Sequence, residues 1–505
     1  MSGFSFPCSG IARAVVLAAA AVSLAACSNG GDSSDDQVNA ELRSKLSATS
    51  LTGDPSTGRT LPSIADPLPQ LGKLLFYTKA LGGDGDSACV TCHHPVLGGG
   101  DDLALPVGVG ADLPDLLGPG RNHSTLATHY DGGPTVPRNA PSTFNIALWD
   151  SVLFWDGRVE SLGKSAGANG GDGQGIRTPD SAFGIADPDA GPNLAVSQSR
   201  FPVTSAEEMR GFLFEAGNNN AAVRDHLQQR VGGYGEAATE LARNFWLSQF
   251  QTAFNSGDDA QTLITFDNIV LAIGEYERSQ VFVDTPWKAF VEGDDGAIGD
   301  SAKRGALLFL NDVSEGGAGC AACHQGDFFT DEGFHVLAIP QFGRGKGNGD
   351  SADDDFGRAR ETGDDADRYA FRTPTLLNVA VTGPWGHDGA YDTLEGIVRH
   401  HLNPAAAVAS YDYGLLPLGT QTMNAVTNTQ KALDVLLARR AAGQPAIQDV
   451  DLSDGEVADL VEFLHTLTDP CVTDRACLTP WIPATDEVDP DGLSVFAIDQ
   501  AGNAL

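Results

Sequence analysis

The chain has 505 residues, enough for two or more domains of ordinary size. Its 67 acidic residues outnumber the 31 basic ones and give a formal net charge of −36, which makes nucleic acid a poor partner and a basic or small neutral partner a better one. Adaptation to a salty habitat is the alternative explanation of this balance.

The first 27 residues have the pattern of an export signal. Arg13 precedes an apolar run from Ala14 to Ala26, which is too short to span a membrane. The ending Leu24-Ala25-Ala26-Cys27 looks like a bacterial lipobox, which implies lipid on Cys27 and a polar tether over residues 28–39. We therefore expect a periplasmic protein that meets the membrane only through this lipid. An ordinary secretory signal is the alternative.

Two copies of Cys-x-x-Cys-His, at residues 89–93 and 320–324, are the strongest chemical signal in the chain. Two such thiols attach a haem through its vinyl groups, and the adjacent histidine binds the iron. A zinc knuckle or a thiol redox pair also uses Cys-x-x-Cys, but neither requires the histidine. The motifs therefore predict two haem c groups, held by Cys89, Cys92 and His93 and by Cys320, Cys323 and His324.

The remaining cysteines suggest one disulfide. Of the eight cysteines, Cys8 leaves with the signal, Cys27 takes lipid and four hold haem. Cys471 and Cys477 are left, and in an exported protein they are expected to form a short-loop disulfide.

The segments around the two motifs repeat each other at an offset of 231 to 233 residues. Residues 72–76 match residues 305–309, and residues 141–147 match residues 374–380. We therefore expect a mainly α-helical protein of two cytochrome c-like haem domains related by internal duplication. With a boundary at the polar turn Ser256-Gly257-Asp258, the domains span residues 40–258 and 259–470, and a C-terminal tail covers residues 471–505.

Apolar stripes predict a helix around residues 266–273 and another around residues 457–464, and no long alternating pattern predicts a strand. Residues 98–136 and 166–202 are rich in Gly, Pro and Asp, which predicts long irregular insertions in the first domain.

A further helix, beginning near residue 393, carries an apolar stripe that continues to His401. We expect His401 to lie on the buried face and to be the sixth ligand of the second haem, because His400 points off that face. The alternative is that His401 is a core histidine bonded to a carbonyl, with His400 or Met423 as the ligand.

Asn169 stands at the position of the first half that corresponds to His401, and asparagine does not bind haem iron. The first iron is therefore expected to keep an open sixth site for peroxide, unless His123 or His129 of the insertion caps it. Trp155 corresponds to His387 and could carry charge between the haems or simply fill the core.

Residues 65–470 resemble the bacterial dihaem cytochrome c peroxidases and the related MauG enzymes. The resemblance rests on the two haem motifs in this order and on residues 71–76, 138–142, 154–158, 371–380, 387–389 and 393–395. It implies an oxidoreductase that reduces hydrogen peroxide with electrons from a small cytochrome c or a cupredoxin. A MauG-like enzyme that oxidises residues of a partner protein, and a non-enzymatic dihaem electron carrier, are the alternatives. Whether the family's homodimer persists stays open.

The resemblance also implies roles for single residues. Trp155 falls on the inter-haem tryptophan, and Glu208 falls on the distal glutamate that moves a proton between the peroxide oxygens. Residues 205–208 read equally as a helix capping box. Asn139, with the carbonyls of Thr382 and Pro384, falls on the ligands of a calcium ion.

Three positions depart from the family pattern. Ser165 replaces the distal glutamine, Val109 replaces the histidine that caps the resting first haem, and His401 replaces the methionine or tyrosine of the second haem. A bis-histidine haem lies at a lower potential than a histidine–methionine haem, so the last change matters most. The missing methionine and the missing resting ligand both favour the MauG-like interpretation.

Overall fold

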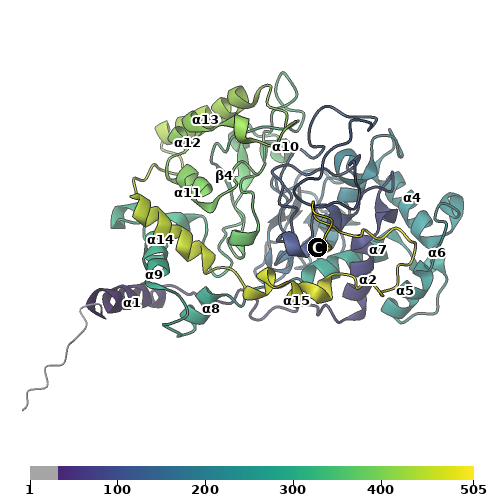
Figure 1. Ribbon diagram of the computed structural model, residues 1–505, viewed down its shortest axis with the longest axis horizontal. Coiled ribbons are helices and arrows are strands. Elements are labelled where there is room, and N and C mark those ends of the chain that lie inside the picture. Colours follow the sequence, from purple (N-terminus) through teal and green to yellow (C-terminus); the bar gives the residue numbers. More distant parts are fainter. Residues whose placement is uncertain (1–31) are drawn as a thin grey trace, which may run out of the picture.

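The computed structural model describes residues 32–505, so the predicted signal and Cys27 lie outside the described residues. Helices and turns dominate, and among these residues no helix is both long and apolar enough to cross a membrane. Figure 1 shows two lobes: α2 and α4 to α7 lie in one, and α9 and α11 to α14 in the other. The helices are α1 (Asp32–Ser47), α2 (Pro67–Tyr77), α3 (Leu194–Ser199), α4 (Asn220–Gly232), α5 (Trp246–Phe254), α6 (Ala260–Leu263), α7 (Phe266–Arg278), α8 (Pro286–Val291), α9 (Asp300–Leu310), α10 (Ala359–Thr362), α11 (Leu394–Leu402), α12 (Pro404–Ser410), α13 (Ala425–Ala441), α14 (Asp454–His465) and α15 (Arg475–Leu478).

The strands are only two or three residues long, in agreement with the missing alternating pattern. One antiparallel sheet pairs Leu153 with Val159 and Glu160 with Arg177, and a second pairs His335 with Phe371. Residues 98–136 contain no helix or strand. The strands are β1 (Val152–Leu153), β2 (Val159–Ser161), β3 (Ile176–Arg177), β4 (Phe334–Val336) and β5 (Ala370–Arg372).

A close helix crossing organises the core of each lobe. α2 crosses α7 at Gly72, where an added Cβ would lie 1.9 Å from the carbonyl oxygen of Ala272. α9 crosses α14 at Gly305, where an added Cβ would lie 1.9 Å from the carbonyl oxygen of Asp459. Only glycine allows two backbones to approach so closely. The helices predicted around residues 266–273 and 457–464 are thereby confirmed as α7 and α14.

The boundary predicted at residues 256–258 is wrong, because it assigns α7 to the second domain. α7 buries Ile269 and Ile273 in the same core as Leu75 of α2. Directly after α7, Val283 and Trp287 lie in the second core. The polar turn before α7 marks a loop, and the apolar stripe of α7 decides which lobe the helix joins.

Both ends of the described chain pack differently from the expectation. The tether predicted over residues 28–39 is shorter, since α1 begins at Asp32 and docks Leu42 and Leu46 in the second core. Residues 471–505 return to the first lobe, where Asp491 accepts hydrogen bonds from Thr78 Oγ1 and Trp246 Nε1, each 2.8 Å long. Figure 1 shows this yellow segment across that lobe. The predicted disulfide between Cys471 and Cys477 is confirmed.

Buried ion pairs join the two lobes. Arg138 donates to Asp156 over 2.6 Å within the first half and to both carboxylate oxygens of Asp355 in the second, over 2.7 and 2.8 Å. Arg358 of the second half likewise donates to Glu160 over 2.6 Å. All these charged side chains are buried, so the positions of the two lobes depend on charge partners from both halves.

Two cavities that meet at Trp155

Each Cys-x-x-Cys-His motif lines a cavity, and its histidine is oriented by a backbone carbonyl. His93 Nδ1 lies 3.1 Å from Gly99 O, and His324 Nδ1 lies 3.1 Å from Phe329 O. This leaves Nε2 of each ring free to bind a metal, as a carbonyl partner does for ligating histidines in general. Burial lowers the pKa of His324 to about 4 and also lowers the pKa of His93, so both rings are neutral, as a metal ligand must be.

The second cavity has a volume of about 630 Å³, within the range of roughly 300–1,000 Å³ that is usual for ligand and cofactor sites. Cys320, Cys323, His324 and His401 line it, with an otherwise largely apolar wall. The rings of His324 and His401 have centroids 6.4 Å apart. Two imidazoles with metal–nitrogen bonds of roughly 2 Å each would need about this spacing across one ion. The residues present therefore fit a haem with two histidine ligands.

Of the three candidate sixth ligands, only His401 lines this cavity. His401 Nδ1 lies 2.8 Å from Ile397 O, which leaves its Nε2 free. His400 is fully buried and uses both nitrogens, with Tyr391 Oη at 2.7 Å and Leu337 O at 2.8 Å. Met423 is 93% exposed. Both histidines contact a backbone carbonyl, but only His401 lines the cavity and keeps a free ring nitrogen.

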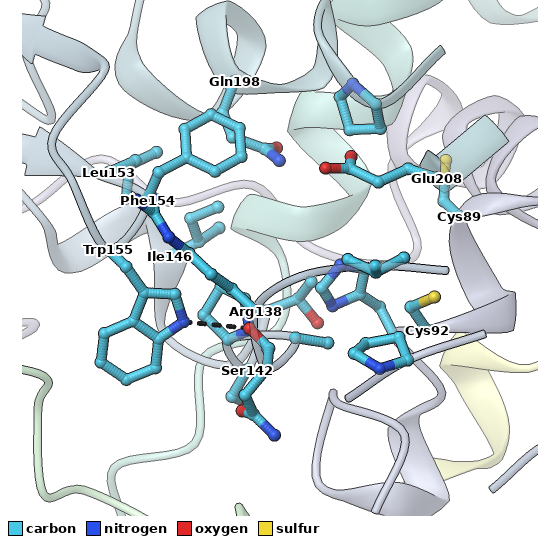
Figure 2. A pocket seen from close by; sticks show the side chains of 18 of the residues that line it. Cys89, Cys92, Arg138, Ser142, Ile146, Leu153, Phe154, Trp155, Gln198 and Glu208 are labelled. Atoms are coloured by element: carbon cyan, nitrogen blue, oxygen red, sulfur yellow. Dashed lines mark hydrogen bonds between the residues drawn. The ribbon is translucent and has the colours of Figure 1, made fainter. Parts of the chain in front are cut away.

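Glu208 lines the first cavity together with His93. It lies in a single π-helical turn, Ala206–Arg210, of a kind often found at functional sites. Ser205 Oγ accepts from the Glu208 N–H over 3.3 Å, so Ser205 does cap the turn, but it is Glu207 whose carboxylate contacts Ser205 Oγ, at 3.1 Å. The Glu208 carboxylate instead points into the cavity (Figure 2).

The charges around Glu208 come from both halves of the chain. Burial raises the pKa of Glu208, and the positive charges of Arg158 and Lys346 oppose this rise. Arg158 Nη2 lies 3.9 Å from Glu208 Oε1. Lys346 reaches the first cavity from the second half, and sequence comparison of the two halves gave no sign of it. The arrangement places the Glu208 carboxyl beside two cations in the first cavity.

Gln198 is an amide side chain of the first cavity that the sequence analysis missed. Ser165 is exposed and does not line the cavity, so its assignment to the glutamine position is wrong. Gln198 lines the cavity, and its buried Oε1 has no hydrogen-bond partner among the described residues. Figure 2 shows its amide on the same side of the cavity as Glu208. Gln198 lies in the segment without a counterpart in the second half, so the repeat could not find it.

No histidine of the insertion lines the first cavity. His123 Nδ1 lies 2.9 Å from Gly133 O, and His129 packs on Phe212 with ring centroids 4.4 Å apart. Val109 is buried elsewhere, and Asn169 is a structural brace whose Nδ2 donates to two backbone carbonyls of residues 146 and 149. Besides His93, the described side chains therefore bring no second histidine to this cavity.

Trp155 lines both cavities, and its indole Nε1 donates to Asn139 O over 2.9 Å (Figure 2). Trp149 also borders both, with the Arg372 guanidinium 3.6 Å above its ring. The second cavity is also lined by the three residues that were matched to calcium ligands, Asn139, Thr382 and Pro384.

One further group of metal-binding side chains lies beside the second cavity. Cys323, Asp331 and His335 hold their ligand atoms within 4.8 Å of one another. Because the Cys323 thiol belongs to the haem motif, this group is not an independent metal site.

Comparison with known proteins agrees with this geometry. The family model of the di-haem cytochrome c peroxidases matches residues 67–296. The chain is similar to the methylamine utilization protein MauG of Methylorubrum extorquens, with 27% identity over 410 residues, 81% of this chain and 88% of that protein. It is similar to the cytochrome c551 peroxidase of Pseudomonas aeruginosa, with 25% identity over 383 residues, 71% of this chain and 84% of that protein.

Solved structures share the fold. A MauG-like protein associated with microbial copper homeostasis matches 86% of this chain and 97% of its own, with a TM-score of 0.52 and 20% identity. The diheme peroxidase BthA of Burkholderia thailandensis matches 87% of this chain and 92% of its own, with a TM-score of 0.51 and 20% identity. The family and site together define an oxidoreductase with two haem c groups. Over most of its length the chain resembles the bacterial dihaem cytochrome c peroxidases and the MauG enzymes.

Proposed function

We propose that this enzyme reduces hydrogen peroxide in the first cavity with electrons that a small redox protein delivers to the second. The observation that carries the proposal is that Glu208 shares a cavity with His93, while Trp155 borders both cavities. Bound haem iron supplies the site at which peroxide binds and the electrons that its cleavage consumes. The protein supplies the proton transfers and the path between the cavities.

Glu208 acts as the proton carrier. Breaking the O–O bond requires a base that takes the proton of one peroxide oxygen and returns it to the leaving oxygen. The Glu208 carboxyl, half-buried and 3.9 Å from Arg158, can hold a proton and give it up again. The orphaned Gln198 Oε1 is an acceptor for a hydrogen of the bound peroxide. Arg158 and Lys346 stabilise the negative charge that develops on the leaving oxygen.

Trp155 carries charge between the two sites, and His401 is the sixth ligand of the second haem. The support for the ligand is the 6.4 Å spacing of the His324 and His401 rings together with the free Nε2 of His401. Histidine on both sides gives the second haem a low potential. It then accepts electrons less readily from a donor of high potential, and it stabilises an oxidised iron better.

A calcium ion between the lobes completes the proposal. Its ligands are Asn139 Oδ1 and the carbonyl oxygens of Thr382 and Pro384, the hard oxygen donors that calcium prefers. The support is that all three residues border one cavity beside Trp155. Measuring the calcium content of the purified protein tests this site.

We further propose that the lobes arose by duplication of one cytochrome c-like unit. The support is the equivalent crossings at Gly72 and Gly305, two residues that the sequence repeat pairs. In this division the first unit ends with α7, the second runs from α8 to residue 470, and residues 471–505 return to the first.

The protein is periplasmic, and a lipid on Cys27 holds it to the membrane. The net charge of −36 favours a basic cytochrome or cupredoxin as donor.

Replacing Glu208 tests the peroxidase function. We expect Glu208→Gln to lower kcat/KM for peroxide by about 10² to 10⁴-fold, the usual contribution of general acid–base catalysis, in assays with a reduced small cytochrome c. Glu207→Gln is the matched control, because Glu207 neighbours it in the chain but does not line the cavity. Equal activity of both variants would show that Glu208 only completes the helical turn.

A MauG-like oxidation of a partner protein is the second candidate. It is favoured by the buried Val109 at the position of the missing resting ligand and by the exposure of Met423 away from the second cavity. The first feature leaves the first haem without a resting histidine ligand, and the second leaves the second haem without a methionine ligand. Negligible steady-state turnover with any electron donor, together with a rapid spectral change on adding peroxide, would favour this candidate over the peroxidase. Since the family is one of enzymes, the electron-carrier interpretation is not retained.

A further inference from the structure

A row of aromatic rings leads from His401 toward the surface of the second lobe. The ring centroid of His401 lies 6.3 Å from that of His400, and His400 lies 5.3 Å from Tyr391. Tyr391 lies 5.6 Å from Tyr411, which lies 4.8 Å from Tyr413. We call Tyr391, Tyr411 and Tyr413 the tyrosine row. Four successive ring contacts thus join a residue of the second cavity to a surface turn.

His400 and the tyrosine row differ in their exposure to solvent. His400 is fully buried, whereas the three tyrosines are partly exposed. Tyr413 begins a short 3₁₀ turn, Tyr413–Leu415, whose last residue is 84% exposed. The chain has eight tyrosines, and three of them lie in this one row. A phenol side chain is one of those that can be oxidised by one electron.

The hydrogen bonds of the row suit the oxidation of a phenol, which gives up its proton together with an electron. His400 Nε2 lies 2.8 Å from Leu337 O, and because a carbonyl only accepts, Nε2 carries the hydrogen. Nδ1 is then the acceptor for the Tyr391 hydroxyl at 2.7 Å. Tyr413 shares a 2.7 Å hydrogen bond with Thr429, and Tyr411 donates to Ala390 O over 2.7 Å.

Neither role proposed for the cavities needs this row. A route to the surface would let the enzyme take electrons from donors that are too bulky to enter either cavity.

We propose that the tyrosine row lets the enzyme oxidise bulky phenols at its surface, a second activity that rests on the proposed peroxide reduction. Two phenol molecules each lose one electron and one proton at Tyr413 and leave as phenoxyl radicals. The electrons pass through Tyr411 and Tyr391 to the second haem site and then through Trp155 to the first cavity. There the O–O bond of one peroxide breaks, and two electrons and two protons give two molecules of water.

Every tyrosine returns to its starting state in this scheme. Tyr391 loses one electron together with its hydroxyl proton, and it regains both when the next electron arrives from Tyr411. Tyr411 and Tyr413, being partly exposed, exchange their protons with water. The net reaction therefore consumes only peroxide and the phenol.

A light-triggered measurement tests the row without peroxide. In the holoenzyme, a ruthenium photosensitiser is attached to the cysteine of the Leu415→Cys variant. A light flash oxidises the label, which then draws an electron from the reduced second haem. The oxidation of this haem is followed by its absorbance. We expect Tyr411→Phe and Tyr413→Phe to slow this step by about tenfold, because a phenyl ring lacks the oxidisable hydroxyl. Tyr234→Phe is the control, since Tyr234 hydrogen-bonds Ile264 O in the first lobe. Equal rates of haem oxidation in the labelled parent protein and in the three tyrosine variants would show that the tyrosine row carries no electrons.

Steady-state assays with peroxide test the activity itself, with a dimethoxyphenol or a reduced cytochrome c as donor. For Tyr413→Phe we expect the ratio of phenol turnover to cytochrome turnover to fall about tenfold, and for Tyr234→Phe we expect it to stay constant. Peroxide consumption with an unchanged ratio would refute surface oxidation. If the unmodified enzyme consumes no peroxide with either donor, the proposed function fails, and the flash experiment still decides whether the row conducts.

Discussion

His400 and His401 show how two identical neighbouring side chains acquire different surroundings. One residue along a helix turns the side chain by about 100°. His401 therefore faces the second cavity with a free Nε2, while His400 turns into the core, where Tyr391 and Leu337 occupy both of its nitrogens. The apolar stripe of the helix was enough to predict which of them lies on the cavity side. The 6.4 Å spacing to His324 could come only from the fold.

Replacing His401 by methionine tests its ligand role. We expect the potential of the second haem to rise by on the order of 100 mV, because axial ligands set haem potentials across about 0.8 V. A redox titration followed by absorbance, and the low-spin EPR signal, report the change. His400→Gln should leave both readouts at the values of the unmodified enzyme. A shifted potential in His400→Gln and an unaltered one in His401→Met would reverse the assignment.

Matching of sequence motifs assigned the family's distal glutamine position to the wrong residue and missed Gln198. Counting from the aligned motifs assigned the distal amide to Ser165, which is exposed. The segment between β3 and α4 has no counterpart in the second half, so the register is lost there. Only the folded chain shows that α3 returns Gln198 to the cavity beside Glu208.

At the scale of elements, two glycines decide how the helices of each lobe cross. The sequence predicted α7 and α14 from their apolar stripes, and it paired Gly72 with Gly305. It could not show that each glycine is the contact point of a crossing, because the partner helix lies more than a hundred residues away along the chain. The same distance explains why α7 was assigned to the wrong lobe.

Substitution of Gly305 tests the crossing. The Cβ of Gly305→Ala would lie 1.9 Å from Asp459 O, so α9 and α14 must move apart. We expect a loss of about 1–3 kcal/mol in the free energy of unfolding, the usual cost of overpacking, in chemical denaturation of the holoenzyme. Gly257→Ala, where an added Cβ meets nothing within 4 Å, should change the stability by less than about 0.5 kcal/mol. Equal stability of the two variants would argue against the close crossing.

For the whole molecule, buried charges fix the lobes against each other around Trp155. Burial alone would raise the pKa of Asp355, but the charge and hydrogen bonds of Arg138 outweigh it and hold the value at about 2. The same guanidinium keeps the pKa of Asp156 below its usual range. Since both carboxyls have lower pKa values in the folded state than in the unfolded one, their contribution is present above about pH 4 and is lost as the pH falls toward 2.

Removing the shared cation tests this interface. We expect Arg138→Met to lose about 3–5 kcal/mol at pH 7, because it leaves the Asp355 carboxylate buried without its cation and leaves Asp156 with Arg158 alone. Without Arg138, burial raises the pKa of Asp355, so this variant should gain stability from pH 7 to pH 5. The unmodified protein should change little over that range. Denaturation curves at both pH values measure the difference, and parallel behaviour of the two proteins would exclude the proposed charge coupling.

The sequence by itself determined the covalent chemistry: the two haem motifs, the disulfide pair, the main helices and the family follow from residue types at short, fixed spacings. The tertiary structure alone decided which residues complete each cavity. Contacts between distant segments bring Gln198 and Lys346 to the first cavity, place Trp149 and Trp155 between the two cavities, and form the tyrosine row. Short spacings between residues can be read from the sequence. Contacts between distant segments depend instead on how the helices cross, and the crossings are determined by packing across the whole molecule.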